Sequence, residues 1–421
     1  MIRFVTKTLG EICDDVGGII RTGPFGTQLH QSDYSKEGTP VIMPQNIVDG
    51  KVSDEDIARI RDEDVNRLLN HRLQVGDIVY GRRGDIGRRA LITKNEEGWL
   101  CGTGSLRISL GGTVIDPIFL YYYLGQSRVI NLIYNNAIGA TLPNLNTSII
   151  RRIPITYPTM PDQCKIASIL SAYDDLIENN QRRIRILDDM AQMLYREWFV
   201  KFCFPGHEKI KIADSELGPI PEGWEVVNLA DIVEFIRGVE PGSSSYIDFP
   251  KDGYIAFLRV GDLGDRKSNI FVPYTLVNNK ILNKTDIALS LDGTIGIVRL
   301  GLVGAYSAGI RKIVIKNSTK ISWTYLYCLL RSDYIQEIIK ANAKGTTIIH
   351  AGSATKKMII GLPPIALLEC FESNTAPLLK LVLNLADKIN ILRQTRDLLL
   401  PKLISGELDV SNIDIKVVEA A

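Results

Sequence analysis

Residues 161–202 read PDQCKIASILSAYDDLIENNQRRIRILDDMAQMLYREWFVKF, and the spacing of apolar residues in this stretch decides the fold. They recur at alternating intervals of three and four residues, which is the a/d pattern of a helix that packs along a narrow seam against another helix. Helix-terminating residues bound the stretch, with Pro158 and Pro161 at its start and Pro205-Gly206 after its end. A helix of about 40 residues is roughly 60 Å long, more than packing inside a compact domain requires. The pattern therefore predicts a long spacer helix in a coiled coil.

The same seam recurs near the C-terminus. Each seam position has a counterpart 205 residues later, so we infer a tandem duplication in which each half ends in a long helix. The alternative is two unrelated core helices of one large domain. The paired positions are Ile177 and Val382, Asn180 and Leu385, Ile184 and Ile389, Leu187 and Leu392, Ala191 and Arg396, Leu194 and Leu399, and Trp198 and Leu403.

Two of these seam residues are polar. Asn180 lies inside the first seam, and Arg396 is expected to face outward from an a position of the second. Polar seam residues can set the register of a coiled coil, although Arg396 could instead meet a partner subunit.

The globular parts of the chain repeat as well. The segment GDIVYGRRGDIG at residues 76–87 is matched 209 residues later by TDIALSLDGTIG at residues 285–296. The first predicts a strand, a tight turn at Gly84-Asp85 and a returning strand. Residues 9–12 are matched by residues 229–232 at an offset of 220, and the offset falls to 205 at the long helices. The two globular parts therefore share a scaffold and differ in their loops.

Two shorter features of the first globular part also carry expectations. Residues 40–44, PVIMP, read as a short buried strand. The acidic run at residues 54–64 reads as the solvated face of a helix rather than as a metal site, because its spacing lacks the tight turn that metal ligands need.

We expect a mixed α/β fold in which two tandem globular domains are joined by two long helices and related by a pseudo-twofold internal repeat. A dyad perpendicular to the helices would make them antiparallel neighbours and let two partner copies bind equivalently. The expected divisions are a first globular domain at 1–158, a long helix at 159–204, a linker at 205–222, a second globular domain at 223–364, a long helix at 365–408 and a tail at 409–421.

Composition leaves the partner of this protein open. The chain has 421 residues with 45% hydrophobic content, enough for two or three domains with cores, and a net charge of only +1. Any surface for nucleic acid must therefore be a local patch. The six cysteines form no CxxC pair, and no signal peptide or membrane-spanning apolar run is present. We expect a cytoplasmic protein with reduced thiols and no membrane partner.

Motifs for independent catalysis are missing from the sequence. It contains no phosphate-binding GxxxxGK[ST] loop, HExxH, zinc-type Cys/His cluster or GxSxG turn, and no glycine-rich loop suited to S-adenosylmethionine. We expect no catalytic residues, metal site or cofactor in this chain. We interpret His30, His71 and His207 as hydrogen-bonding residues, while His350 lies in a polar loop with two lysines and is a candidate contact residue.

Four motifs resemble one family, the specificity subunits of type I restriction-modification systems, over essentially the whole chain. They are TGPFGTQLHQSDY at residues 22–34, GDIVYGRRGDIG at 76–87, LGPIPEGWEV at 217–226 and LLLPKLISGEL at 398–408. The resemblance implies that each globular part is a target-recognition domain that reads one half of a bipartite DNA site. It also implies that the long helices pack antiparallel, hold the domains apart and dock two modification subunits, which recruit restriction subunits.

The same resemblance implies a non-catalytic subunit of a complex that is both a site-specific deoxyribonuclease and an adenine-specific DNA methyltransferase. S-adenosylmethionine, ATP and magnesium are then expected on the partner subunits. Recognition domains held apart by two long helices would engage half-sites of double-stranded DNA about one turn of the DNA, ~34 Å, apart.

Base chemistry selects the candidate DNA contacts, because arginine suits guanine and phosphate while asparagine and glutamine suit adenine. In the first domain these are Gln28, Gln31, Arg82, Arg83, Arg107, Asn144 and Asn146. In the second domain they are Arg237, Arg259, Lys267, Arg311, His350, Lys356 and Lys357. Arg82 and Arg83 align with Leu291 and Asp292, a mismatch expected of a sequence-reading loop. The candidate residues for the seam and for partner docking are Ile177, Asn180, Ile184, Leu187, Leu194, Trp198, Val382, Leu385, Ile389, Leu392, Arg396 and Leu399.

Two other functions are left open by the sequence. One is a self-sufficient DNA methyltransferase or nuclease with recognition domains of this type, which methyl transfer by the purified chain would reveal. The other is a coiled-coil adaptor without a DNA role, whose globular parts bind proteins.

Overall fold

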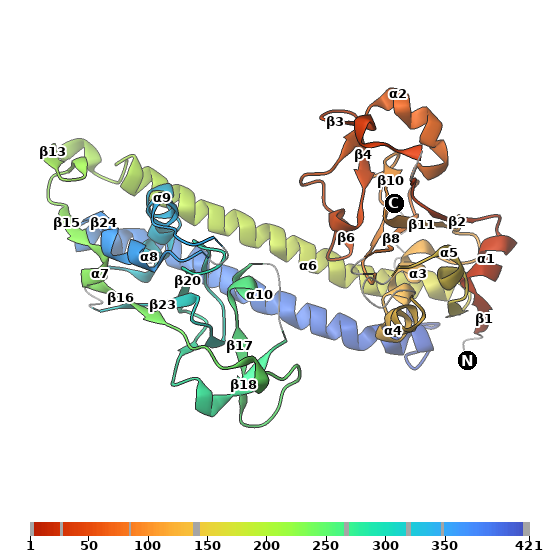
Figure 1. Cartoon of the computed structure of the whole chain (residues 1–421). Coiled ribbons are helices and arrows are strands. Elements are labelled where there is room, and N and C mark those ends of the chain that lie inside the picture. The colour runs from red at the N-terminus through yellow and green to blue at the C-terminus, as the bar shows by residue number, and fades with distance from the viewer. Residues whose placement is uncertain are drawn as a thin grey trace. The chain divides into compact units, whose positions relative to one another are not determined.

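A computed structural model describes residues 4–25, 28–83, 86–137, 144–264, 269–316, 321–346 and 349–415 (Figure 1). The chain forms two compact units: unit 1 comprises residues 1–177 and 391–421, and unit 2 comprises residues 178–390. The long helices α6 (Met160–Tyr195) and α10 (Ile365–Ser405) contribute a segment to each unit. Each unit thus combines a globular domain with parts of both helices.

The central sheet of unit 1 has the strand order β2-β11-β8-β9, and every pair in it is antiparallel. Its strands are β2 (Ile19–Thr22), β11 (Ser105–Ser109), β8 (Ile78–Gly81) and β9 (Arg89–Leu91). β8 is buried throughout, as expected of an apolar, β-branched run. It pairs with β9 and so confirms the predicted strand and returning strand, while the turn at Gly84-Asp85 lies outside the described residues.

A smaller sheet of unit 1 has the order β10-β4-β7-β3. Its strands are β10 (Leu100–Cys101), β4 (Thr39–Ile42), β7 (Arg59–Ile60) and β3 (Tyr34–Ser35). A hairpin of β5 (Ile47–Val48) and β6 (Lys51–Val52) forms a separate two-stranded sheet. β4 is the predicted buried strand. The acidic run at 54–64 is mostly not a helix: only α2 (Asp62–Val65) is helical, and β7 occupies the middle of the run.

Helices and a two-stranded ribbon complete unit 1. β1 (Val5–Thr8) pairs with β12 (Pro154–Tyr157), and the Thr8 side chain caps α1 (Leu9–Asp15). The helices α3 (Pro117–Leu124), α4 (Ser127–Asn136) and α5 (Thr147–Arg151) contribute side chains to the same hydrophobic core as the central sheet. The beginning of α6 and the end of α10 join this core through Leu170 and Leu403.

Unit 2 repeats this architecture. Its central sheet has the order β16-β23-β20-β21, again antiparallel throughout. The strands are β16 (Val233–Arg237), β23 (Ile310–Ile315), β20 (Ile287–Ser290) and β21 (Val298–Arg299). β20 and β21 begin 209 residues after β8 and β9, at the offset read from the sequence.

The remaining elements of unit 2 follow the same pattern. α8 (Trp323–Leu330) and α9 (Asp333–Ala341) begin 206 residues after α3 and α4. β15 (Glu225–Asn228) pairs with β24 (Ile359–Leu362), and the Asn228 side chain caps α7 (Leu229–Ile232). The duplication is therefore visible in the order of the elements as well as in the residues.

The smaller sheets show where the two units differ. In unit 2 the order is β18-β17-β22-β19, built from β17 (Tyr254–Leu258), β18 (Phe271–Pro273), β19 (Ile281–Leu282) and β22 (Gly304–Tyr306). The parallel pair β17-β22 corresponds to β4-β10 of unit 1. The fourth strand is added beside β7 in unit 1 and at the opposite end, beside β22, in unit 2. The shared scaffold thus carries different peripheral segments.

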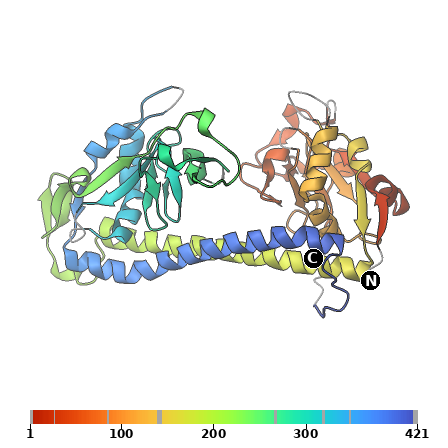
Figure 2. The same ribbon diagram turned by 90° about the horizontal axis from the view of Figure 1, so that it is seen from below.

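Within each unit the segments of α6 and α10 lie side by side (Figure 2). In unit 1 the Arg396 guanidinium of α10 bonds to Asp174 of α6, and in unit 2 the rings of Tyr195 and Phe371 lie 6.4 Å apart. The beginning of each helix therefore pairs with the end of the other, so the paired segments run antiparallel. None of the fourteen seam residues is exposed, as packing along a seam requires.

Two expectations about the helices need correction. Arg396 does not face outward, because Asp174 of the facing helix supplies a carboxylate partner for its guanidinium. The helical region after α6 ends in one wide turn, η5 (Arg196–Val200), and Phe202 adopts a left-handed φ of 59° that stops the helix before residue 204.

The connector at residues 205–222 is not simply an extended linker. It contains a short turn, η6 (His207–Lys209), and a hairpin of β13 (Ile212–Ser215) with β14 (Gly218–Pro221). Gly218, the first residue of β14 after the turn, has a φ of 86°, which glycine adopts without strain. Among the described helices, none is long and apolar enough to cross a membrane.

Candidate nucleic-acid interface

One end of the central sheet in unit 1 gathers the arginines that follow β8. Because β11 runs antiparallel to β2 and β8, the last residues of β2 and β8 lie opposite the first residues of β11. Immediately beyond β8, Arg82 Nε donates to the carbonyl of Leu145 at 3.0 Å, and Leu145 N donates back to the Arg82 carbonyl at 2.8 Å. Arg83 pairs through the backbone with Asn144. The sheet end thus joins two loops that are distant in sequence.

The two arginines of this loop differ in environment. Arg82 is half-buried, and burial together with the charge of Arg83 lowers the pKa of its guanidinium. Arg83 is exposed. Arg82 therefore holds the loop through its bond to Leu145, while Arg83 presents its donors to solvent.

The equivalent end of the sheet in unit 2 gathers four polar side chains, three of which are candidate contact residues. Arg237, the last residue of β16, lies opposite Arg311 of β23, and both donate to the carbonyl of Ala308. Arg311 Nη2 lies 3.2 Å from Asp292 Oδ2, and His350 Nδ1 lies 2.8 Å from Asp292 Oδ1. Asp292 is the residue that the sequence reasoning missed as a member of this cluster, although its alignment with Arg83 marked it as a divergent position.

Two of the candidate arginines are core residues rather than contacts. Arg107 is 6% exposed; its guanidinium bonds to the Arg72 carbonyl, and its Nε lies 3.5 Å from Asp77 Oδ2. Burial raises the pKa of Asp77. The same ion pair recurs in unit 2 between Lys312 and Asp286, at 2.6 Å. We therefore remove Arg107 from the candidate DNA contacts.

Arg311 is corrected in the same way. It is 8% exposed, and burial lowers the pKa of its guanidinium even though Asp292 lies beside it. Its donors are occupied by Asp292 and by the carbonyls of Ala308 and Ile310. Arg311 therefore positions Asp292 rather than meeting DNA directly.

Asn146 has a structural role as well, because its Oδ1 accepts from Ile149 N at 2.9 Å and caps α5. Asn144 is half-buried, and its Oδ1 is buried with no hydrogen-bond partner among the described residues.

Lys267 lies outside the described residues. The remaining candidates are all exposed and belong to several different segments: Gln28, Gln31, Arg259, Lys356 and Lys357.

The other histidines have local partners. His71 is 7% exposed, and burial followed by the charges of Arg21 and Arg107 lowers its pKa. His207 Nδ1 lies 2.8 Å from the Phe204 carbonyl, and the His30 backbone N donates to Asp33. His207 therefore has the expected side-chain hydrogen bond, and His71 also has one with the backbone of Thr22, while the bond of His30 is made by its backbone and leaves the role of its side chain a prediction.

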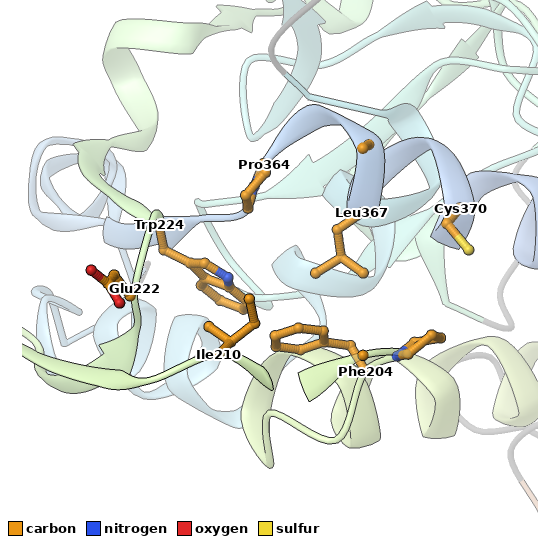
Figure 3. A pocket seen from close by; sticks show the side chains of 10 residues that line it. Phe204, Ile210, Glu222, Trp224, Pro364, Leu367 and Cys370 are labelled. Atoms are coloured by element: carbon orange, nitrogen blue, oxygen red, sulfur yellow. The ribbon is translucent and has the colours of Figure 1, made fainter. Parts of the chain in front are cut away.

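A shallow apolar cavity of about 310 Å³ opens in unit 2 beside the start of α10 (Figure 3). The rings of Phe204 and Trp224 lie 6.0 Å apart within its wall. Among its ten lining residues only Glu222 carries a charge, so it lacks the converging polar groups of a catalytic centre. No cluster of three or more His, Cys, Asp or Glu side chains suited to a metal ion occurs within the described ranges.

The fold defines a class of protein in which one α/β domain occurs twice, each copy built on the same central sheet and attached to long helices. The sequence model of the family described as "Type I restriction modification DNA specificity domain" matches residues 1–187 and 221–366. The chain belongs to this family, which confirms the resemblance inferred from its motifs and the mixed α/β fold with two globular domains.

Individual relatives agree. The chain is 30% identical over 307 residues to the specificity subunit of the type I restriction enzyme MjaIX of Methanocaldococcus jannaschii. The matched region covers 70% of each chain. It is 21% identical over 408 residues to the HindI specificity subunit of Haemophilus influenzae, covering 80% of this chain and 87% of that protein. The crystal structure of a type I restriction-modification S subunit from M. genitalium aligns over 96% of both chains with a TM-score of 0.55 and 19% identity, a likeness in fold.

Proposed function

We propose that this chain is the DNA sequence-specificity subunit of a type I restriction-modification complex, and that each globular domain reads one half of an asymmetric bipartite site. The observation that carries the proposal is the duplication itself. Both units use the same central strand order, yet the side chains at the same sheet end differ, with Arg83 in one and Asp292 in the other. Equal scaffolds with different surface chemistry suit two half-sites of different sequence.

The long helices set the separation of the half-sites in this proposal. α6 and α10 pass without interruption from one unit into the other. A continuous helix transmits a fixed rise per residue, so its length determines a spacing in a way that a flexible linker would not.

The helices also supply two equivalent docking surfaces for modification subunits. Exposed apolar residues recur on them at the same offset of 205 residues as the seam. The pairs are Leu176 and Leu381, Ile186 and Ile391, and Met193 and Leu398. On α10, Ile391 and Leu398 are seven residues apart and so lie two turns apart on one helix face. Exposed apolar faces of this kind mark protein interfaces. A repeated surface suits two copies of one partner.

Catalysis belongs to the partner subunits in this proposal. The modification subunits would use S-adenosylmethionine, and the restriction subunits that they recruit would use ATP and magnesium. The chain itself contributes sequence choice on double-stranded DNA and has no catalytic residue.

Methylome sequencing tests the proposed function. A host that carries this chain with its cognate modification subunit is compared with a host that lacks only the chain. A split, asymmetric methylated motif that depends on the chain is the expected result. If the complex assembles and no such motif appears, the specificity role is wrong.

A further inference from the structure

We propose that Arg83 in unit 1 and His350 in unit 2 are the base-reading side chains of one equivalent backbone pair, contributed by opposite members of that pair, and that their opposite hydrogen-bonding polarity makes the two half-sites differ there. This inference rests on the proposed function of the two domains as DNA readers. It assigns individual residues to the discrimination that the duplication only implies.

The backbone places the two residues on the same platform. Leu145 N donates to the Arg82 carbonyl at 2.8 Å, and its counterpart Ala351 N donates to the Leu291 carbonyl at 2.7 Å. These bonds sit directly after the equivalent strands β8 and β20. The next backbone pair is Arg83 with Asn144 in unit 1 and Asp292 with His350 in unit 2. The platform is retained between the halves, while its side chains are exchanged for others of different chemistry.

In unit 2 a buried cation holds the reader in place. Arg311 forms an ion pair with Asp292 on the buried side of the cluster, and the Asp292 side chain is only 13% exposed. Asp292 Oδ1 then holds His350 Nδ1 at 2.8 Å, while the imidazole remains 60% exposed. The loop that carries His350 is closed by reciprocal backbone bonds with Lys344, at 2.7 and 2.9 Å. His350 is thus an exposed ring on a fixed support.

The support also decides what His350 can recognise. A carboxylate only accepts hydrogen bonds, so Nδ1 must be the donor to Asp292. In the neutral ring Nε2 is then an acceptor. In the major groove the donors that suit it are the amino groups of adenine and cytosine.

Unit 1 presents the opposite polarity. The exposed Arg83 guanidinium carries donors and no acceptor, so it suits O6 and N7 of guanine. Asn144 does not compete with it as an acceptor, because its Oδ1 is buried. At the equivalent backbone pair, one half-site is therefore read through base acceptors and the other through a base amino group.

The test uses the full chain assembled with its modification subunits and reads the methylated motif at single-base resolution at pH 8. His350→Ala is expected to relax one position of one half-site about five- to tenfold, and Arg83→Ala to relax one position of the other half-site by up to about a hundredfold. Both side chains are exposed, so the variants should fold and assemble like the wild type, which the melting temperature and the mass of the complex check.

Lys357→Ala is the matched control, an exposed cation in the 3₁₀ turn η10 (Gly352–Lys357) near His350 in sequence. It should weaken methylation of all sites equally and leave the motif unchanged, as loss of a phosphate contact does. If His350→Ala keeps the wild-type motif with unchanged discrimination at every position, the inference is wrong and the proposed function stands. If both variants relax the same half-site, the assignment of one reader to each domain fails. A wild-type complex without a bipartite motif would overturn the proposed function and this inference together.

Discussion

Replacing one exposed apolar residue on each long helix tests whether the repeated surfaces dock two partners. Met193 is 63% exposed and Leu398, its counterpart in the repeat, is 68% exposed. Complete burial of such a side chain contributes about 1.5–3 kcal/mol, so the two-thirds still accessible here offer about 1–2 kcal/mol to an interface. Losing that contribution raises Kd about five- to thirtyfold, and a glutamate weakens binding further because its carboxylate loses water on docking.

The expected result is a change in stoichiometry. At concentrations only a few times the wild-type Kd, the wild-type chain should bind mainly two modification subunits, Met193→Glu and Leu398→Glu should each bind mainly one, and the double variant should bind few or none. Native mass spectrometry of the complexes measures this directly. The free energy of unfolding should change by less than about 0.5 kcal/mol, because both side chains are mainly exposed.

Leu276→Glu is the control, since it places the same charge on a 44% exposed leucine outside the long helices. It should retain both partner copies. The docking assignment is refuted if the single helix variants keep full stoichiometry, or if Leu276→Glu lowers it as much as they do.

Three further outcomes are expected. Phe371→Ala removes a fully buried ring that lies 4.9 Å from that of Phe199, and it should lower the free energy of unfolding in denaturant by about 3–5 kcal/mol. The control Phe249→Ala, at a side chain that is 55% exposed, should lower it by about 0.5 kcal/mol or less. Equal losses would contradict the assignment of Phe371 to the core. Arg107→Ala leaves the Asp77 carboxylate buried without its cation and should cost about 3–5 kcal/mol at pH 8. Since burial already raises the pKa of Asp77, the ionised form is the costly one, so this loss should shrink as the pH falls through that pKa. A pH-independent loss would argue against the ion pair. Exchanging residues 80–89 for those of a relative should change one half of the methylated motif, and a change in both halves would contradict one domain per half-site.

The two units keep some polar pairs and change others, and the difference separates scaffold from reader. Asp77 with Arg107 and Asp286 with Lys312 form the same acid-to-base pair beside the central sheets of the two units, buried in unit 1 and half-buried in unit 2. A buried charge without a partner is costly, so replacing one member of such a pair is tolerated only when the charge is kept. Arg83 is exposed and meets no such constraint. Side chains at the sheet end could therefore diverge while the interior remained alike.

Part of the candidate site could be predicted from the sequence, and part could not. Arg83 and His350 were identified by their polar loops, and both are exposed. Arg107 and Arg311 have the same chemistry in the sequence yet are buried, and the acidic residues that neutralise them lie in distant segments, next to the ends of other strands. Asp292 was missed as a site residue because an acidic side chain does not by itself suit DNA, and its role depends on holding His350.

The sequence by itself determined the duplication, the long helices and the paired strands β8 and β9. These depend on local spacing: a seam every three or four residues follows from the geometry of one helix, and a constant offset is visible without any fold. Only the tertiary structure decided which candidate cations are exposed and which are buried in ion pairs, and that Arg396 meets Asp174 rather than solvent. Burial and ion pairing join residues far apart in the chain, so they are properties of packed strands and helices and cannot be read from the spacing along any one of them.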